Sequence, residues 1–187
     1  MAWTPPPPRP GHPYYMYESI YAQPGAIRLV LRQNADTLKA AAERLKAVDR
    51  VFLSGIGTSW HACLVGELLL SRIGRLGHRV RAFHSFEFKN YWPDPDPRSG
   101  VIVVSHRGTK RFSLEALQKA KAGGGIAIAI TGQGSGEGLK IADYSLVTVE
   151  QENSAAHTIS YTTALALLAA LAAEIGGDAE VARALLV

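Results

Sequence analysis

The sequence predicts an α/β fold in which helices cover both faces of a parallel β-sheet, a three-layer α-β-α sandwich. Five short apolar runs resemble strands that are buried on both faces, at 50–54, 79–84, 101–104, 126–130 and 144–149. Helical patterns separate these runs, and strands that alternate with helices become parallel neighbours. The 187 residues are enough for one such domain, which would bury roughly 70% of its unfolded surface.

The helices are predicted from the spacing of their apolar residues. A short helix over 15–21 is expected to stop before Pro24, because proline breaks a helix interior. From Gly25 to Val48, apolar residues recur at helical spacing and predict one long amphipathic helix. Further elements are predicted as helices at 58–74, 110–122, 156–175 and 179–187, a helical turn at 86–92 and a glycine-rich loop at 132–138.

Composition excludes several functional classes. The formal net charge of +4 is modest, and no basic run with interleaved aromatic residues suggests a nucleic-acid partner. Cys63 is the single cysteine, which excludes an internal disulfide and a cysteine-rich zinc site, and we expect it to be a small buried apolar residue. No metal is expected.

The ends and apolar runs of the chain suggest a cytoplasmic protein. Residues 1–13 are rich in proline and lack the apolar region of a signal peptide, so we expect a disordered or polyproline II tail. The longest apolar run, 164–173, is too short to cross a bilayer, so no membrane contact is expected.

Two short loops carry the strongest functional signal. Residues 55–59 (Gly-Ile-Gly-Thr-Ser) follow the first strand, residues 105–109 (Ser-His-Arg-Gly-Thr) follow the third, and each loop opens onto a helix. Free backbone N–H groups, the positive end of the helix dipole and nearby hydroxyls suit a phosphate. Because loops on neighbouring strands would converge, the predicted phosphate ligands are Gly57, Thr58, Ser59, Ser105, His106, Arg107, Gly108, Thr109 and Lys110.

Commoner phosphate motifs do not fit these loops. The Gly-Lys-Ser/Thr ending of a Walker A loop is absent. The dinucleotide fingerprint needs a third glycine where Trp60 stands, and an acidic residue where His84 and Ser85 stand. We therefore expect no cofactor.

The order of motifs resembles the sugar isomerase (SIS) family, in particular the first SIS unit of the isomerase half of glucosamine-6-phosphate synthase. Residues 16–24 resemble the family's N-terminal helix with its acidic-Ile-x-x-Gln-Pro core, and residues 55–62 its Gly-x-Gly-Thr-Ser-aromatic-His-Ala loop. Glu87-Phe88, Ile130-Thr131 and the 152–163 stretch follow in family order, so the resemblance covers about 16–175.

The resemblance implies a five-stranded parallel sheet in flavodoxin-like order, two-one-three-four-five. In that order the carboxyl ends of the first and third strands form the switch-point crevice, where both loops lie. It also implies a single SIS domain over 14–187, which could be the N-terminal half of a protein with two SIS units.

Two segments depart from the family pattern. Arg107 and Lys110 replace a serine and a threonine in the Ser-x-Ser-Gly-x-Thr loop. Either cation could pair with phosphate, arginine as a bidentate fork and lysine as a point charge, or could point to solvent. At the start of the last helix, Ala155, His157 and Ile159 replace the family's Val, Ser and Lys.

Isomerisation between aldose and ketose needs a base beside the sugar carbons. In the synthase a second SIS unit supplies this carboxylate, so the base is unknown here. The candidates are His157 with Glu152 as its partner, and Glu87. For His157 an exposed cap position is the alternative, for Glu87 a structural role, and His61 is expected to pack rather than to act as a base.

The predicted function is binding of a phosphorylated sugar or amino sugar, as part of a phosphosugar isomerase, deglycase or aminotransferase-type isomerase unit. A second SIS unit or subunit would complete the site. The alternatives are a non-enzymatic sugar-phosphate sensor and a structural dimerisation module. The apolar last helix and the long helix from Gly25 suggest more apolar surface than one sheet face covers, so we expect a homodimer.

Overall fold

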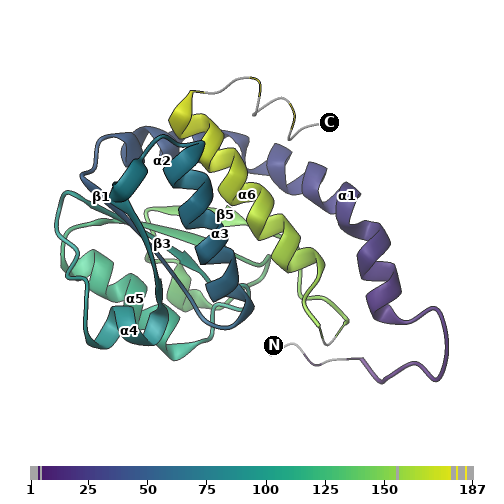
Figure 1. Ribbon diagram of the computed structural model, residues 1–187. Helices are drawn as coiled ribbons and strands as arrows, with labels where there is room; N and C mark the ends of the chain where they lie inside the picture. Colours follow the sequence, from purple (N-terminus) through teal and green to yellow (C-terminus); the bar gives the residue numbers. More distant parts are fainter. Residues whose placement is uncertain (1–3, 5, 155, 178–179, 181–183, 185–187) are drawn as a thin grey trace.

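A five-stranded parallel sheet in the order β2-β1-β3-β4-β5 forms the centre of the molecule, as predicted (Figure 1). The computed structural model describes residues 4, 6–154, 156–177, 180 and 184. Every residue of β3 and β4 is buried, which explains their uninterrupted apolar runs. The strands are β1 Arg50–Gly55, β2 Val80–His84, β3 Ser99–Val104, β4 Ile126–Thr131 and β5 Tyr144–Val147.

Helices cover both faces of the sheet and complete the predicted three layers (Figure 1). One face carries α1 Tyr15–Gln33, α2 Ala35–Lys46, α3 Thr58–Arg72 and α6 Ile159–Gly176. The other carries α4 Ser85–Asn90 and α5 Arg111–Ala122. Each face has its own buried hydrophobic cluster. The short 3₁₀ turns are η1 Gly77–Arg79 and η2 Glu137–Leu139.

The prediction that the first helix stops before Pro24 is wrong, because α1 continues through this residue to Gln33. Proline lacks the N–H that would bond the carbonyl four residues earlier. Here the side-chain Nε2 of Gln23 donates to that carbonyl, Ile20 O, at 3.1 Å. The helix therefore keeps this carbonyl paired while it passes the proline.

The single long helix predicted from Gly25 to Val48 is also wrong, because Asn34 divides it into α1 and α2. Asn34 is 3% exposed, and its Nδ2 donates to Val30 O at 2.7 Å and to Val147 O at 2.8 Å. Its Oδ1 accepts from the Val147 N–H at 2.7 Å. The break thus ties the helices to β5, the edge strand of the sheet.

The helix α6 packs against α1, α2 and α3, and in Figure 1 it lies between α3 and α1. Its leucines at 167, 168 and 171 are fully buried. Gly66 of α3 permits this packing, since a Cβ there would lie 3.1 Å from Leu168. The apolar circumference of α6 is therefore covered largely within the chain itself and does not by itself require a dimer.

Among the residues that the structure describes, α6 is the one helix long and apolar enough to cross a membrane by length and composition. Half of it is buried inside the domain, as expected for a core helix. The closing helix predicted over 179–187 lies outside the described residues, apart from 180 and 184.

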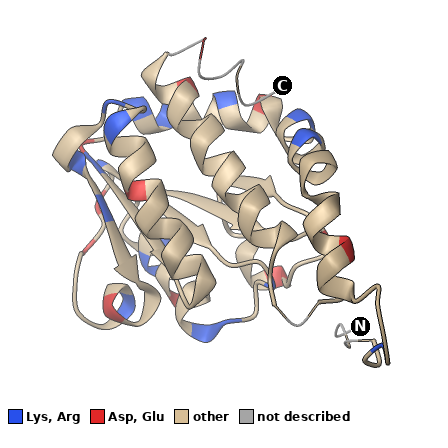
Figure 2. Cartoon of the chain, turned by 45° about the vertical axis from the view of Figure 1, so that its right-hand side comes forward, with Lys and Arg blue, Asp and Glu red and all other residues tan. Residues whose placement is uncertain are grey.

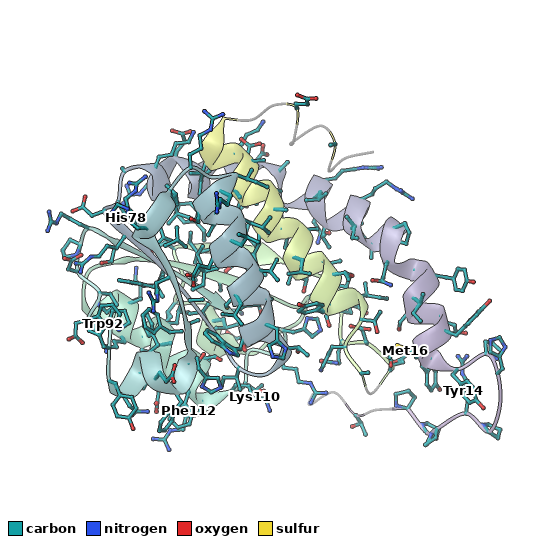
Figure 3. All side chains as sticks on the ribbon, viewed as in Figure 1. Tyr14, Met16, His78, Trp92, Lys110 and Phe112 are labelled. Carbon is teal, nitrogen blue, oxygen red and sulfur yellow. The ribbon has the colours of Figure 1, made fainter. Side chains whose placement is uncertain are left out.

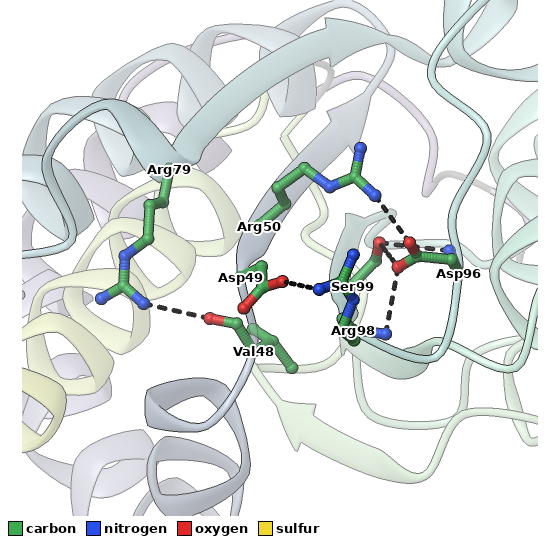
Figure 4. Close-up of polar contacts among 7 residues, drawn as sticks. All are labelled: Val48, Asp49, Arg50, Arg79, Asp96, Arg98 and Ser99. Atoms are coloured by element: carbon green, nitrogen blue, oxygen red, sulfur yellow. Dashed lines mark hydrogen bonds and ion pairs between the residues drawn. The ribbon is translucent and has the colours of Figure 1, made fainter.

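Charged residues are spread over many elements of the surface (Figure 2). At the amino ends of β1 and β3, Asp96 pairs with Arg50 at 2.7 Å and accepts from the Ser99 hydroxyl at 2.7 Å (Figure 4). In the proline-rich segment, Arg9 forms an ion pair with Glu18 of α1 at 2.7 Å. The Arg50–Asp96 pair fastens the amino-terminal edge of the sheet, opposite the carboxyl ends of the strands. The Arg9–Glu18 pair holds the proline-rich segment to α1.

Candidate functional site

A cavity of about 220 Å³ lies where both predicted loops meet the start of α6. The first loop contributes Thr58 and Ser59, and the apolar wall includes Ile56, Ala62, Val104 and Ile130. The second loop and α5 contribute Ser105, His106, Arg107, Lys110 and Ser113. The end of β5 and the start of α6 contribute Thr148, His157, Ser160 and Tyr161. The structure thus brings six of the predicted phosphate ligands to one place.

The other predicted residues do not line the cavity. Gly57, Gly108 and Thr109 lie in the loops beside it, and Glu152 and Glu87 are also absent from its wall. Gly57 has a backbone φ of +60°, a left-handed conformation that favours glycine, and it is the residue before α3 begins. Its role is therefore to turn the chain so that the first turn of α3 faces the cavity.

The second loop is fastened to the neighbouring strand β4. The N–H of Ser105 donates to Ile130 O at 2.9 Å, and the N–H of Gly132 donates to His106 O at 2.8 Å. Gly132 has no room for a side chain, because a Cβ would lie 2.6 Å from Cε1 of His106. The His106 ring is thereby packed against backbone and held at the cavity wall.

Three helices begin near the cavity, and they differ in whether a side chain accepts hydrogen bonds from the backbone N–H groups of their first turn. Neither α3 nor α5 has an acidic residue in its first turn or a side-chain cap. By contrast, the Glu152 carboxylate accepts from the N–H groups of Thr158 and Ser160 at the start of α6, at 2.9 and 2.8 Å. The donors at the starts of α3 and α5 are therefore the ones without a side-chain acceptor of the protein's own.

The charged groups of the cavity are cationic. Lys110, the residue before α5, is exposed. Figure 3 labels it at the lower edge of the molecule. Arg107 is also exposed, and its Nε donates to Gln151 Oε1 at 3.0 Å. No aspartate or glutamate among the described residues lines the cavity. This charge balance favours an anionic ligand.

His106 is a neutral group at neutral pH. Burial, with a smaller contribution from the neighbouring His157, lowers its pKa to about 4. Its Nδ1 lies 3.2 Å from the hydroxyl of Thr148, which itself donates to Thr131 O at 3.1 Å. His106 therefore adds no positive charge to the cavity at neutral pH.

Of the three candidate bases, His157 alone lines the cavity. Its Nδ1 lies 3.2 Å from Ser160 Oγ, and its ring centroid is 5.9 Å from that of His106. Glu152 is 5% exposed and is engaged at the start of α6. Glu87 is exposed on α4. The structure thus places His157 with the two loops and leaves both carboxylates outside the cavity wall.

Glu152 is held as an ionised group. Burial acts to raise its pKa, but hydrogen bonds from the Ser160 hydroxyl and from backbone N–H groups at the start of α6 outweigh this effect, so the pKa is lowered. Cys63 is fully buried, as predicted, and burial raises the pKa of its thiol far above the ordinary value. It is therefore not a reactive group of the site.

Sequence reasoning missed Ser160, Tyr161 and Thr148 as wall residues. The signal available for Thr148 was a hydroxyl at the carboxyl end of the last predicted strand, and for the other two a position near the start of the last predicted helix. Both places face the carboxyl edge of a parallel sheet, where ligands bind in such folds.

The profile of the SIS domain family matches residues 44–174. The chain belongs to the SIS domain family. It is 32% identical over 167 residues to the glutamine–fructose-6-phosphate aminotransferase [isomerizing] of Thermococcus kodakarensis, and also to that of Pyrococcus horikoshii. These alignments cover 88% and 89% of the chain but 27% and 28% of the relatives, so it spans about a quarter of their length.

Solved structures share the fold. The C-terminal domain of glucosamine-fructose-6-phosphate aminotransferase from Francisella tularensis superposes with a TM-score of 0.75 at 20% identity, over 94% of this chain and 53% of that one. The sugar isomerase domain of the RpiR transcription factor from Sphaerobacter thermophilus gives 0.70 at 23% identity, over 91% and 95%. At these identities the likeness establishes the architecture of the SIS domain.

Proposed function

We propose that the cavity binds a phosphorylated sugar or amino sugar, and that the chain is the SIS unit of an isomerase of the aldose–ketose type. One observation carries this proposal: the starts of α3 and α5, which lack side-chain caps, meet at a cavity with hydroxyls, two cations and no carboxylate among the described residues. A phosphate would supply the acceptor and the negative charge that this place lacks.

The classes of enzyme to which such a unit would belong are phosphosugar isomerases, deglycases and aminotransferase-type isomerases. The named relatives with 32% identity are isomerising aminotransferases, which supports this class. A second SIS unit or a second copy would complete the site, because the chain matches only part of these relatives. Exposed apolar residues support such a partner, namely Tyr17, Ile20, Tyr21 and Leu29 of α1 and Leu64 and Leu68 of α3.

We place the protein in the cytoplasm, without a nucleic-acid or membrane partner.

A non-enzymatic sugar-phosphate sensor is the second candidate. It is favoured by the S. thermophilus domain, which comes from a transcription factor and is matched over 95% of its length by this one chain. A sensor needs a phosphate-binding site but no proton acceptor. Binding of glucose 6-phosphate without exchange of its C2 hydrogen with solvent would therefore favour this candidate.

Thermal unfolding with and without fructose 6-phosphate tests the phosphate site. A ligand at 100 times its Kd stabilises a protein by about 2.7 kcal/mol, which for a chain of this size raises Tm by about 5–11 °C. Fructose without phosphate should give no comparable shift. In S59L, a leucine at the start of α3 should occupy the phosphate position and abolish the shift.

H61A is the matched control, because His61 is exposed in the same helix turn and does not line the cavity. This variant should keep the full shift. An equal rise in Tm for S59L and the wild type would contradict the assignment of the site.

A further inference from the structure

The side chains of His157, Ser160 and Glu152 form a continuous hydrogen-bonded chain from the cavity wall into the protein. His157 Nδ1 lies 3.2 Å from Ser160 Oγ, and the Ser160 hydroxyl lies 2.6 Å from Glu152 Oε1. Ser160 and Glu152 are 4% and 5% exposed, whereas His157 is half-buried at the cavity. Water therefore has little access to the inner two members of the chain.

The buried end of this chain, Glu152, determines which group donates in each hydrogen bond. Glu152 has a lowered pKa and is an acceptor only at neutral pH. The single hydroxyl proton of Ser160 is donated to it, at a short distance typical of a charge-assisted bond. Ser160 Oγ can then only accept from His157. The hydrogen of the neutral His157 ring must therefore be on Nδ1.

We propose that Ser160 and Glu152 are positioning residues that hold His157 as the Nδ1–H tautomer, so that its unprotonated Nε2 is the proton acceptor of the site. This inference rests on the proposed function. Free imidazole side chains favour the Nε2–H form, which has no lone pair at that nitrogen. A fixed hydrogen bond at one ring nitrogen is the usual means by which a protein selects the other for chemistry.

The reaction step balances without a co-reactant. Nε2 takes the proton from C2 of an aldose phosphate, and the electron pair of the broken C2–H bond forms the C1=C2 bond of an enediol. The π pair of C1=O moves to O1, which takes a proton from water. Nε2–H, whose proton can exchange with solvent while the enediol is bound, then protonates C1, as O2 returns a proton to water and C2=O forms. The imidazolium between these steps would face the Glu152 carboxylate through one hydroxyl.

Four other groups lie around His157 in or behind the cavity wall. His106 faces it at a ring distance of 5.9 Å and is itself neutral because burial lowers its pKa. Arg107 and Lys110 line the same cavity, and Glu152 is the anionic group behind Ser160. A bound sugar phosphate would bring its negative charge to the two cations of the cavity.

The variant S160A separates this role from the structural role of Glu152. It removes the link to His157, but the N–H groups of Thr158 and residue 160 can still bond the carboxylate. T162A is the matched control, because the Thr162 hydroxyl bonds Thr158 O on the same helix turn and has no contact with His157.

Nitrogen-15 NMR of the histidine rings in the ligand-free chain at pH 7 reads the tautomer directly. We expect His157 of the wild type and of T162A to have the hydrogen on Nδ1, and S160A to shift the majority to Nε2. An Nε2–H majority in the wild type, or an unchanged ratio in S160A, would overturn the inference. Because no ligand is present, that failure is distinct from a missing thermal shift with fructose 6-phosphate.

Exchange of the C2 hydrogen of glucose 6-phosphate with D₂O tests the acceptor itself. A positioned base contributes roughly 10²–10⁴ in rate, so H157Q should exchange at least about a hundredfold more slowly than the wild type. Equal rates in the two proteins, including two rates at background, would overturn the role of His157 as acceptor.

Discussion

Removal of the Glu152 carboxylate tests how far α6 depends on an acceptor supplied from outside the helix. Glu152 is 5% exposed and accepts from the N–H of Thr158 at 2.9 Å, the N–H of Ser160 at 2.8 Å and the Ser160 hydroxyl at 2.6 Å. In E152A these three donors lose their partner at once. The helix that they begin packs against α1, α2 and α3, so its first turn matters for the whole core.

The magnitude follows from these bonds. A buried donor left without an acceptor costs about 1–3 kcal/mol, and loss of a helix N-cap costs about 1 kcal/mol. At the lower end of this range for three donors, we expect E152A to lose about 3 kcal/mol of the free energy of unfolding. In a chain of this size that loss lowers Tm by about 6–12 °C.

The pH dependence provides a second measurement. Because the pKa of Glu152 is lowered in the folded protein, its ionisation stabilises the fold above the unfolded pKa of about 4.3. That contribution is lost as pH falls through the lower folded value. The difference in unfolding free energy between the wild type and E152Q should therefore be present at pH 7 and diminish below about pH 4.

Calorimetry or circular dichroism at pH 7 provides the assay. The control is E87A, which removes an exposed carboxylate on α4 and should change the free energy by no more than about 0.5 kcal/mol. A Tm of E152A within 2 °C of the wild type would refute the claim that loss of this acceptor at the start of α6 costs about 3 kcal/mol.

Two further predictions concern close packing. G132A should lose about 1–3 kcal/mol and bind fructose 6-phosphate more weakly, because a Cβ would lie 2.6 Å from the His106 ring; G25A, with open space around it, is the control, and equal stability of the two variants would contradict the overlap. N34A should lose about 3 kcal/mol in urea unfolding, since it removes three bonds, two of them to the edge strand β5, whereas Q33A removes one exposed bond; a smaller loss for N34A than for Q33A would count against that tie.

Much of the fold followed from local patterns. The apolar runs of β1 to β5 and the helices between them were predictable, because strands buried on both faces exclude polar residues and amphipathic helices repeat at a fixed spacing. The strand order came with the SIS resemblance and is confirmed. The errors at Pro24 and Asn34 have one cause: side-chain bonds of Gln23 and Asn34 to carbonyl groups decide whether the helix continues.

The sequence by itself determined that residues with hydroxyl groups and positive charges lie between a strand and the start of a helix at two places, because each strand–loop–helix unit is a local pattern. Only the tertiary structure decided which groups of the site meet. Glu152 was a candidate as the partner of His157 and Glu87 was a further candidate, yet the first is buried at the start of α6 and the second is exposed on α4. The link from His157 through Ser160 to Glu152 depends on the turn that leads from β5 into α6. Spacing along the chain does not specify that path, since the packing of α6 between α1, α2 and α3 sets where its first turn lies.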